Sequence, residues 1–289
     1  MNGVSPDQQT ADAFASSWNH LPTGSVYTRD QFEEWLAPLT RGDVAGRRVL
    51  ELGCGNASLL VHMAGGWNCG FAEGVDLGAS VIPARENLTR AGVDPARWRV
   101  TSGDLISHRD ASGGADVVYC IGVLHHLKEP ADGFASVLQN TRPGGHFHCW
   151  VYGYEGNAVV RMFVEPLRRL LCRFPWWFTK HFAASLLAIP VFLYARALAI
   201  LPRWPWLRGF PLYEYCLWIA RREFAFFRHV VFDQLVTPQT TYLRHSTLVH
   251  WLSSHGSEIE PGSEYILQRN GNSWKFGGIK RENAAATIL

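Results

Sequence analysis

A short apolar run followed by closely spaced glycines constrains this chain more than any other feature of its sequence. Residues 48–52 (RVLEL) lead into Gly53-Cys54-Gly55-Asn56, and residues 57–64 then place apolar side chains at helical spacing. Glycine lets the backbone turn sharply and approach a ligand, and the first turn of a helix offers unpaired N–H groups. The segment therefore predicts a strand, a glycine turn and a helix that together can hold a ligand.

Further short apolar runs alternate with helix-like segments along the first half of the chain. Strands are predicted near residues 70–76, 98–101, 116–121 and 145–152, and helices near 79–91 and 130–140. Continuous apolar strands that alternate with helices are typical of a parallel sheet covered on both faces. The expected fold class is therefore α/β.

The end of the chain has a different pattern. Ser246 is a candidate N-cap for a helix over 247–255, which Gly256 would end. Residues 264–269 and 273–276 are β-prone and flank Asn270-Gly271-Asn272, a strong hairpin signal. The sheet is therefore expected to finish with an antiparallel strand.

The glycine turn does not fit a dinucleotide site. The pattern G-x-G-x-x-G would need glycine at position 58, where the sequence has Ser58. Glu51, directly before the turn, would repel a pyrophosphate, whereas its carboxylate could accept hydrogen bonds from a ligand ammonium. Two more acidic residues, Asp76 and Asp104, end the next two predicted strands.

Taken in order, these motifs resemble those of the class I S-adenosylmethionine-dependent methyltransferases of small-molecule type. The first motif of that family is an apolar strand, an acidic residue and G-x-G-x-G, and Ala57 stands here at the last glycine. The motifs that follow are Gly74-Val75-Asp76-Leu77, Ser102-Gly103-Asp104-Leu105, the strand 116–121 with its exit Leu124-His125-His126-Leu127, and Arg142-Pro143-Gly144-Gly145. The resemblance covers residues 45–155. It implies a Rossmann-like seven-stranded, mostly parallel sheet with an antiparallel last strand.

The same resemblance implies a cofactor, S-adenosyl-L-methionine, with S-adenosyl-L-homocysteine as the product and no metal. Asp76 would bind the ribose hydroxyls and Asp104 the adenine amino group, although Asp104 alone could instead cap a helix. Cys54 is expected to be a packing residue within the turn. The residues expected to bind the cofactor are Glu51, Gly53, Cys54, Gly55, Asn56, Asp76, Leu77, Asp104, Leu105, Ile121 and Tyr27.

Methyl transfer from a sulfonium is an in-line displacement, so the protein must mainly align the acceptor and exclude water. A base is needed only where the acceptor carries a proton that must leave. His126 occupies the family's histidine position, and either His125 or His126 could be that base. Alternatively, His126 only shapes the cofactor pocket. Polar residues that follow the fifth strand are candidates for contact with the acceptor, because ligands bind at this edge of open α/β sheets: Tyr152, Tyr154, Glu155 and Asn157, with Tyr154 and Glu155 in the candidate catalytic set.

Residues 1–44 are expected to form a helical lid over the cofactor. Tyr27 or Arg29 could reach its methionine end, whereas Phe32, Trp35 and Leu36 have the spacing of a helix face buried on the core. The first residues, MNGVSPDQQTADAF, lack the charged start and apolar stretch of a secretory signal, so a cytoplasmic location is expected.

An aromatic and basic insert, residues 155–232, separates the cofactor core (45–154) from the end of the core and its hairpin (233–289). The insert has eleven Lys or Arg and four Asp or Glu, a balance of +7 in a chain of +2, so the remainder carries −5. It is too long for a structureless loop and is expected to be helical.

Within the insert, residues 182–201 carry a single charge, Arg196, and are flanked by tryptophans. This is similar to a membrane span with interfacial aromatics. However, Arg196 would cost about 2.5–3.5 kcal/mol at a helix centre, and Pro190 interrupts the segment. Three interpretations stay open: a soluble lid that forms an apolar substrate pocket, interfacial binding to an anionic membrane through 174–210, and a true span.

The expected function is methyl transfer to an oxygen or nitrogen of a small, apolar or amphipathic metabolite. The alternatives are a peripheral-membrane methyltransferase of a lipid or lipid-linked substrate, and a fold relative that binds the nucleoside without transferring methyl. Nucleic acid is not expected as a substrate, because the basic residues are interleaved with apolar ones.

The sequence also predicts where three sets of polar side chains in or next to the insert lie. Arg168-Arg169 and Arg221-Arg222 form a solvated face or, if they converge on the pocket, favour an acidic substrate. His229 and Asp233, at the end of the insert, could point back to the site, but they are expected at the surface.

Overall fold

The computed structural model describes residues 5–19, 27–171, 173–201 and 204–282. Its centre is a seven-stranded sheet of order β3-β2-β1-β4-β5-β7-β6, in which β1 to β5 are parallel and β7 runs antiparallel to both β5 and β6. The strands are β1 (Arg48–Leu52), β2 (Phe71–Asp76), β3 (Trp98–Ser102), β4 (Ala115–Ile121), β5 (Thr141–Tyr152), β6 (Tyr265–Arg269) and β7 (Ser273–Ile279). The predicted Rossmann-like sheet with an antiparallel last strand is confirmed.

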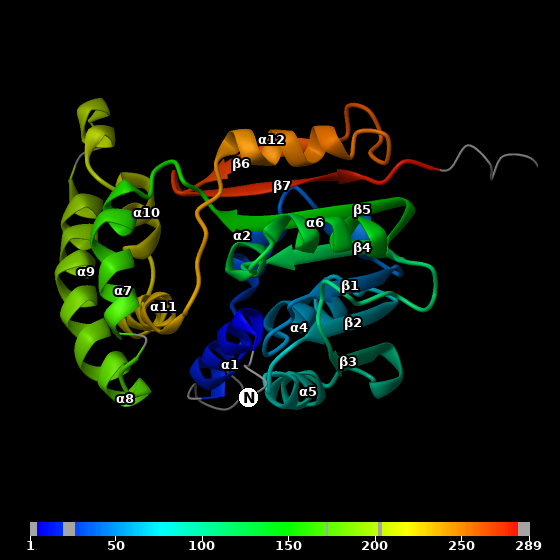
Figure 1. Ribbon diagram of the computed structural model, residues 1–289, viewed down its shortest axis with the longest axis horizontal. Coiled ribbons are helices and arrows are strands. Elements are labelled where there is room, and N and C mark those ends of the chain that lie inside the picture. Colours follow the sequence, from blue (N-terminus) through cyan, green and yellow to red (C-terminus); the bar gives the residue numbers. More distant parts are fainter. Residues whose placement is uncertain (1–4, 20–26, 172, 202–203, 283–289) are drawn as a thin grey trace, which may run out of the picture.

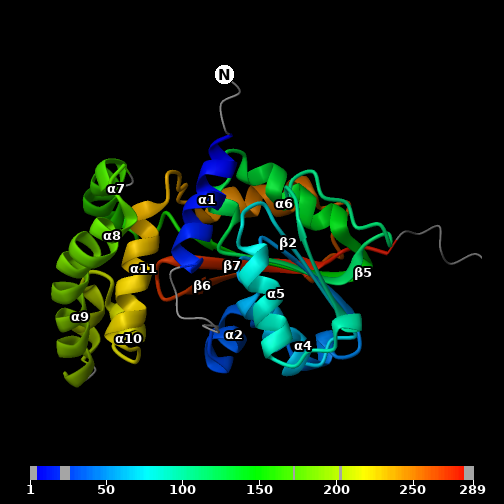
Figure 2. The same ribbon diagram turned by 90° about the horizontal axis from the view of Figure 1, so that it is seen from below.

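Alternating side chains of each strand pack into two separate cores. Val117 and Tyr119 of β4 lie in the core that includes α2, α4 and α5, whereas Val118 and Cys120 lie in the core that includes α6 and α12. Figure 2 shows α6 on one side of the sheet and α2, α4 and α5 on the other. The helices are α2 (Arg29–Leu36), α4 (Ser58–Gly65), α5 (Val81–Arg90), α6 (Pro130–Asn140) and α12 (His245–Ser254), with short turns α3 (Arg41–Val44), η1 (Pro95–Arg97) and η2 (Leu124–His126).

The terminal hairpin and the helix before it show one correct and one wrong prediction. Asn270 and Gly271 both adopt positive φ, 51° and 67°, as an Asn-Gly hairpin turn requires. Ser246 is not the N-cap of α12, because the helix begins one residue earlier at His245. The backbone N–H of His245 instead donates to the carboxylate of Glu155, 3.1 Å away. A residue from a distant segment therefore supplies the cap.

The insert forms a separate helical bundle at the carboxyl ends of β4 and β5, where Figure 1 shows it beside the sheet. Its inner contacts join Ala188 and Leu198 of α9 to Cys216 and Ile219 of α10. Its last helix runs past residue 232. The elements are η3 (Val160–Val164), α7 (Glu165–Leu171), α8 (Trp176–Phe178), η4 (Thr179–Ala183), α9 (Ala184–Ile200), η5 (Pro205–Gly209), α10 (Tyr213–Ile219) and α11 (Phe224–Val236).

The amino-terminal segment lies between the insert and the sheet and contacts both. Helix α1 (Pro6–Asn19) lies between the insert and the sheet in both views. In α2, Phe32, Trp35 and Leu36 are buried as expected. The expectation for Arg29 is wrong: its side chain is 69% exposed and pairs with Glu33 on the surface of α2, away from any cofactor site. The stretch of the expected lid at 20–26 lies outside the described residues.

Candidate functional site

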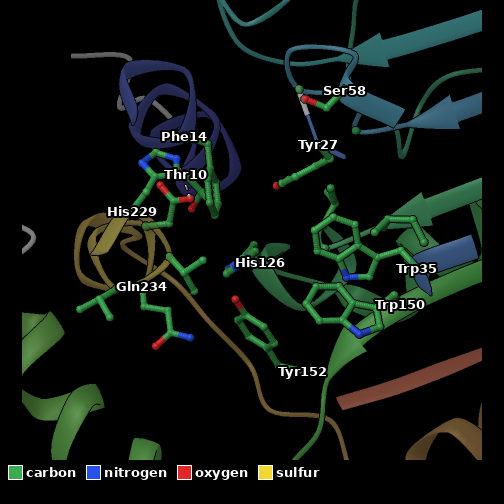
Figure 3. Close-up of a pocket in the computed structure, with 18 of the residues that line it drawn as sticks. Thr10, Phe14, Tyr27, Trp35, Ser58, His126, Trp150, Tyr152, His229 and Gln234 are labelled. Carbon is green, nitrogen blue, oxygen red and sulfur yellow. Dashed lines mark ion pairs between the residues drawn. The ribbon is translucent and has the colours of Figure 1, made fainter. Parts of the chain in front are cut away.

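One cavity of about 470 Å³ opens at the carboxyl ends of the parallel strands. The core supplies one wall, and α1 and the insert supply the opposite wall (Figure 3). All the residues expected to bind the cofactor line this cavity: Tyr27, Glu51, Gly53, Cys54, Gly55, Asn56, Asp76, Leu77, Asp104, Leu105 and Ile121. The structure therefore brings together residues that are spread from position 27 to position 121 of the chain.

The glycine turn forms although Ala57 replaces its last glycine. Gly53 has a φ of +80°, and a Cβ atom there would overlap the side chain of Val123. Ala57 also adopts the left-handed conformation, with φ 61° and ψ 25°, directly before α4 begins. An L-residue can adopt this conformation at a cost of roughly 1–2 kcal/mol. Ala57 thus follows the same backbone path as a glycine, at an energetic cost that glycine would not have.

Asp76 is held in one orientation by the turn beside it. One carboxylate oxygen accepts the N–H of Gly55 at 2.9 Å. The other accepts the N–H of Gly78 at 3.1 Å and the hydroxyl of Ser80 at 2.6 Å. A carboxylate fixed in this way at the end of β2 is suited to accept further hydrogen bonds from hydroxyl groups in the cavity.

Glu51 lies deeper in the cavity, and its side chain is buried. Burial raises the pKa of Glu51 well above its usual range, and the nearby charge of Asp76 raises it further, although the Tyr119 hydrogen bond at 3.0 Å opposes this. A cation placed in the cavity would favour the ionised form. The site therefore fits a ligand ammonium at Glu51.

Two other expected cofactor residues have structural contacts as well. One carboxylate oxygen of Asp104 accepts the N–H of Ile106 at 2.9 Å, so Asp104 both caps a turn and lines the cavity. Cys54 is buried, and burial raises the pKa of its thiol well above the usual range. Its sulfur also occupies the space beside Gly74. Cys54 is therefore a packing residue, as expected.

His126 lines the cavity and has a defined tautomer. Its Nδ1 atom lies 2.9 Å from the carbonyl oxygen of Gln239 and 3.2 Å from the hydroxyl of Thr240. A carbonyl oxygen only accepts, so Nδ1 carries the proton and Nε2 carries the lone pair. Burial lowers the pKa of His126 to about 4, so the ring is neutral at pH 7. Nε2 makes no hydrogen bond to any described residue and can accept a proton.

Comparison with known proteins connects this geometry to a family. A family model described as a methyltransferase domain matches residues 50–147. The chain is 32% identical over 126 residues to the ubiquinone biosynthesis O-methyltransferase of Thiobacillus denitrificans, which covers 43% of this chain and 51% of that protein. It is 31% identical over 148 residues to the protein of the same name from Aromatoleum aromaticum, covering 50% of this chain and 62% of that protein. The chain spans about half the length of these relatives.

This chain contains a methyltransferase domain over residues 50–147. Its fold is similar over 97% of the chain to that of a magnesium protoporphyrin IX methyltransferase from Synechocystis PCC 6803, with a TM-score of 0.52 and 11% identity, covering 99% of that chain. It is also similar to an S-adenosylmethionine-dependent methyltransferase solved in its apo form, with a TM-score of 0.53 and 15% identity, over 88% of this chain and 55% of that chain. At these identities the two similarities concern the fold alone.

Three of the four candidate catalytic residues do not line the cavity of the methyltransferase domain, and their predicted roles are corrected here. Glu155 caps α12 and accepts the indole N–H of Trp274 at 3.1 Å. The ring of Tyr154 lies against the guanidinium groups of Arg161 and Arg244. His125 is fully buried behind His126, with 4.1 Å between their ring centroids, and neither of its ring nitrogens has a hydrogen-bond partner among the described residues. Of the four, only His126 lines the cavity.

Tyr152 and Asn157 line the cavity, as the position after β5 predicts. The amide of Asn157 donates to the carbonyl oxygens of Gly153 and Asn272, so it fixes the end of the strand. The phenol of Tyr152 points toward His126 in Figure 3. Burial raises the pKa of Tyr152 to about 12, so its hydroxyl stays protonated at neutral pH.

The expectation that His229 and Asp233 lie at the surface is wrong. Both line the cavity, and His229 Nε2 lies 3.4 Å from Asp233 Oδ2. Figure 3 shows His229 beside Thr10 and Phe14 of α1. The spacing of four residues on one helix was the available signal, because it places both side chains on the same face of α11. It does not say which way that face points.

Sequence reasoning missed an aromatic and charged corner of the cavity. The guanidinium of Arg269 lies 5.1 Å to 5.7 Å from the ring centroids of Trp35, Trp150 and Trp218. Arg269 also donates to Glu34 at 2.9 Å, and the same carboxylate accepts the indole N–H of Trp218 at 2.9 Å. This corner ties α2 and β6 of the core to α10 of the insert.

The two arginine pairs neither converge on the cavity nor form a single solvated face. Arg168 is buried, donates to Glu165, and donates to the carbonyl oxygen of Thr237 at 2.6 Å. Arg222 pairs with Glu34 at 3.3 Å. Their neighbours Arg169 and Arg221 are exposed. Each pair therefore sends one arginine inward to a structural partner and one outward.

No group of three His, Cys, Asp or Glu side chains that could hold a metal ion lies in the described part of the chain.

Proposed function

We propose that this chain transfers a methyl group from S-adenosyl-L-methionine to an oxygen or nitrogen of a small, apolar or amphipathic molecule. The observation that carries the proposal is the shared cavity. Glu51, Asp76 and the Gly53 turn lie on one side of it, and apolar residues of the insert such as Phe227 lie on the other. A donor site and an acceptor site can therefore face each other within one enclosed volume.

The residues present fit the cofactor group by group. Asp76 would accept hydrogen bonds from the ribose hydroxyls, Glu51 would pair with the ammonium, and Asp104 would meet the adenine amino group. The N–H groups after the Gly53 turn would face the remaining polar atoms. When bound, the cofactor supplies an electrophilic methyl group on a sulfonium. Aromatic and aliphatic side chains of the insert exclude water from that point.

An acceptor that carries a proton needs a base, and we assign this role to His126 Nε2. As the new bond from oxygen or nitrogen to the methyl carbon forms, the carbon–sulfur bond breaks and its electron pair stays on sulfur. The acceptor proton passes to His126 Nε2, which the Gln239 carbonyl keeps in the accepting tautomer. The two curated relatives are named O-methyltransferases, which favours oxygen as the acceptor atom.

Calorimetry and turnover test this proposal in sequence. The chain should bind both S-adenosylmethionine and its demethylated product. A panel of alkylated phenols, alcohols and amines should then yield products heavier by one methyl group in mass spectrometry. Failure to bind either nucleoside would contradict the proposal. Binding without turnover on any acceptor class would instead support a relative that binds the nucleoside and transfers nothing.

A second candidate function adds a lipid or lipid-linked substrate and contact with a membrane. Of the eighteen exposed large hydrophobic side chains among the described residues, fifteen lie between Val159 and Phe210. They include Leu186 (76% exposed), Leu193 (64%) and Trp206 (61%). Such a concentrated apolar surface marks an interaction site. In both views α9 forms the edge of the molecule farthest from the sheet.

The packing of α9 favours binding along the membrane interface over crossing it. The helical segment Thr179–Ile200 is long and apolar enough to span a bilayer, and 28% of its most apolar 18-residue stretch is buried. Its inner face packs on α10 and α11, and Arg196 donates to the carbonyl oxygen of Ala220 at 2.9 Å. The segment thus belongs to the bundle that encloses the cavity. Exposed arginines nearby, such as Arg173 and Arg208, would face anionic head groups.

The mouth of the cavity supports the same candidate. Val159 and Phe163 line the cavity and are themselves 37% and 68% exposed, so the opening borders the apolar surface. A substrate dissolved in a membrane could enter there without crossing water. The proposed location is the cytoplasm, with reversible contact to a membrane through residues 174–210.

Vesicle co-sedimentation tests the membrane candidate. Binding to vesicles with phosphatidylglycerol should exceed binding to phosphatidylcholine alone and should weaken with added salt. The double variant Leu186→Glu and Leu193→Glu should lose binding, and Val249→Glu, an exposed site on α12, should keep it. Equal recovery in the supernatant with and without vesicles would contradict this candidate and leave the methyl transfer proposal untouched.

A further inference from the structure

The polar groups of the cavity are unevenly distributed. Beyond the cofactor residues, much of the wall that the insert contributes is aliphatic or aromatic, as at Val160, Leu187, Val191 and Phe227. Two places differ: the corner of Arg269, whose guanidinium is already paired with Glu34, and a polar end on the other side of the cavity's cofactor residues. Figure 3 shows His126, Tyr152, His229 and Gln234 around that end. An amphipathic acceptor would have to place its polar group there, because the rest of the wall offers it few partners.

A small recess continues this polar end. It measures about 20 Å³, room for about one water molecule. The residues that line both the recess and the main cavity include His126, Tyr152, Asp233, Gln234 and Tyr242. Four of the five carry neutral side chains, since the pKa of His126 is lowered and those of the two tyrosines are raised. Asp233 is therefore the charged residue that the recess shares with the cavity, whereas Glu165 and Arg168, which pair with each other, line the recess alone.

The Asp233 carboxylate faces groups from several elements at once. On its own helix it lies 3.4 Å from His229 Nε2. Burial is the largest cause that raises the pKa of Tyr27, and the charge of Asp233 is the second. The charge of Glu51, across the cofactor site, also raises the pKa of Tyr27. The charge of Asp233 raises the pKa of Tyr152 as well. The charge of Asp233 also raises the pKa of Lys180, in η4, but Lys180 does not line the cavity.

We propose that Asp233, supplied by the insert and positioned by His229, recognises the acceptor through an O–H or ammonium group and excludes carboxylate-bearing acceptors. This inference rests on the proposed function and deepens it by naming the class of substrate. An ionised carboxylate only accepts hydrogen bonds, so it bonds a phenol, alcohol or ammonium and repels another carboxylate. The insert then selects the acceptor's polar group as well as its apolar body.

Two probes that differ only in their polar group test the inference: 4-octylphenol and 4-octylbenzoate. Each is titrated by calorimetry at pH 7.5 into protein saturated with S-adenosylhomocysteine, below the concentration at which the probes form micelles. The wild-type chain should bind the phenol at least tenfold more tightly than the benzoate. Equal affinities, or preference for the benzoate, would overturn the inference without any need for a variant.

Variants then assign the preference to Asp233. Asp233→Asn keeps the shape and removes the charge, so the preference should fall below threefold. His229→Gln should give an intermediate preference, because the carboxylate stays but loses its positioning partner. Glu223→Gln removes an exposed carboxylate at the start of the same helix and should leave the preference unchanged. A wild-type preference that survives in Asp233→Asn would overturn the assignment.

The design separates this inference from the proposed function. If the wild-type chain does not bind S-adenosylhomocysteine, the proposed function is contradicted. Normal binding of that product together with no discrimination between the probes would contradict the role of Asp233 alone. For an acceptor that is turned over, Asp233→Asn should raise KM by tenfold or more and change kcat less, as expected for a group that recognises the acceptor and does not take its proton.

Discussion

The Nδ1 atom of His126 lies 2.9 Å from the carbonyl oxygen of Gln239, three residues beyond α11, the last helix of the insert. The two residues are 113 positions apart in the chain. The contact fixes the tautomer of the histidine, and it makes that tautomer depend on how the insert rejoins the core. The insert thus influences the chemistry of the site as well as its shape.

A variant that preserves this contact separates the two interpretations of His126. In His126→Asn the side-chain amide can still donate to Gln239, but no lone pair replaces Nε2. If His126 is the base, kcat should fall by about 10²- to 10⁴-fold for an acceptor that loses a proton. The affinity for S-adenosylmethionine, measured by calorimetry, should stay within about threefold. Normal kcat with weakened cofactor binding would show instead that His126 only shapes the pocket.

The pH dependence of turnover offers a second check on His126. Its pKa is lowered to about 4 by burial, so the ring is already neutral and able to accept a proton at pH 6. We expect kcat/KM to be level between pH 6 and 8 and to fall only as pH approaches 4. An acid limb near pH 6.5 that His126→Asn removes would contradict the low pKa of the folded state.

The stability of the fold should also depend on pH through His148. Its Nε2 donates to the carbonyl oxygen of Trp35 at 2.8 Å, its Nδ1 accepts the hydroxyl of Tyr265 at 2.7 Å, and burial lowers its pKa to about 4. The unfolded chain, with a pKa near 6.5, binds a proton first as pH falls. The stabilisation is therefore complete above pH 6.5 and is lost on acidification toward pH 4, by about 3 kcal/mol for this one group.

Urea unfolding at a series of pH values measures this dependence. His148→Gln keeps a donor and an acceptor but cannot titrate, so the slope of unfolding free energy against pH between 4 and 6.5 should decrease by about one proton. Identical slopes for the variant and the wild type would show that His148 is not the titrating group.

The carboxylate of Glu34 should stabilise the joint between core and insert. It is the counter-ion of Arg269, which is only 8% exposed, and it also pairs with Arg222. In Glu34→Gln the buried guanidinium of Arg269 loses its negatively charged partner. Because Glu34 is partly exposed, solvent reduces the loss, and we expect the free energy of unfolding to fall by about 1–2 kcal/mol. The neighbouring Glu33→Gln breaks an exposed pair with Arg29, keeps an oxygen that can accept the hydrogen bond of Trp67, and should cause no measurable change. Equal effects from the two variants would contradict a role for the joint.

Asp76 is expected to carry much of the cofactor affinity. Asp76→Asn should weaken S-adenosylmethionine binding at least tenfold, because the amide offers one acceptor where the carboxylate offers two. Calorimetry measures this, and thermal unfolding reports whether the turn that contains Gly55 and Ser80 still forms. Glu86→Gln, at an exposed position on α5, is the control. Unchanged affinity in Asp76→Asn would remove Asp76 from the cofactor site.

Much of the core could be predicted because its signals are local. Apolar runs specify the buried strands, and positive φ at Gly53 and Asn270 is required by turns that the residues themselves favour. Parallel strands place their carboxyl ends at one edge, so residues 51, 76 and 104 meet once the strands are correct. The order of motifs along the sequence was therefore enough to locate the cofactor side of the cavity.

The acceptor side was decided only by tertiary structure. Helix α11 is apolar on more than one face, so nothing in its periodicity shows that His229 and Asp233 turn inward. Glu155 follows β5 as a candidate acceptor contact would, yet it caps a helix ninety residues later. Arg269 and Glu34 meet across 235 positions of the chain. The sequence by itself determined the strands, the glycine turn and the cofactor edge, because each depends on neighbouring residues. Only the packing of the insert onto that edge decided which side chains face the acceptor, because contacts between distant segments leave no local pattern.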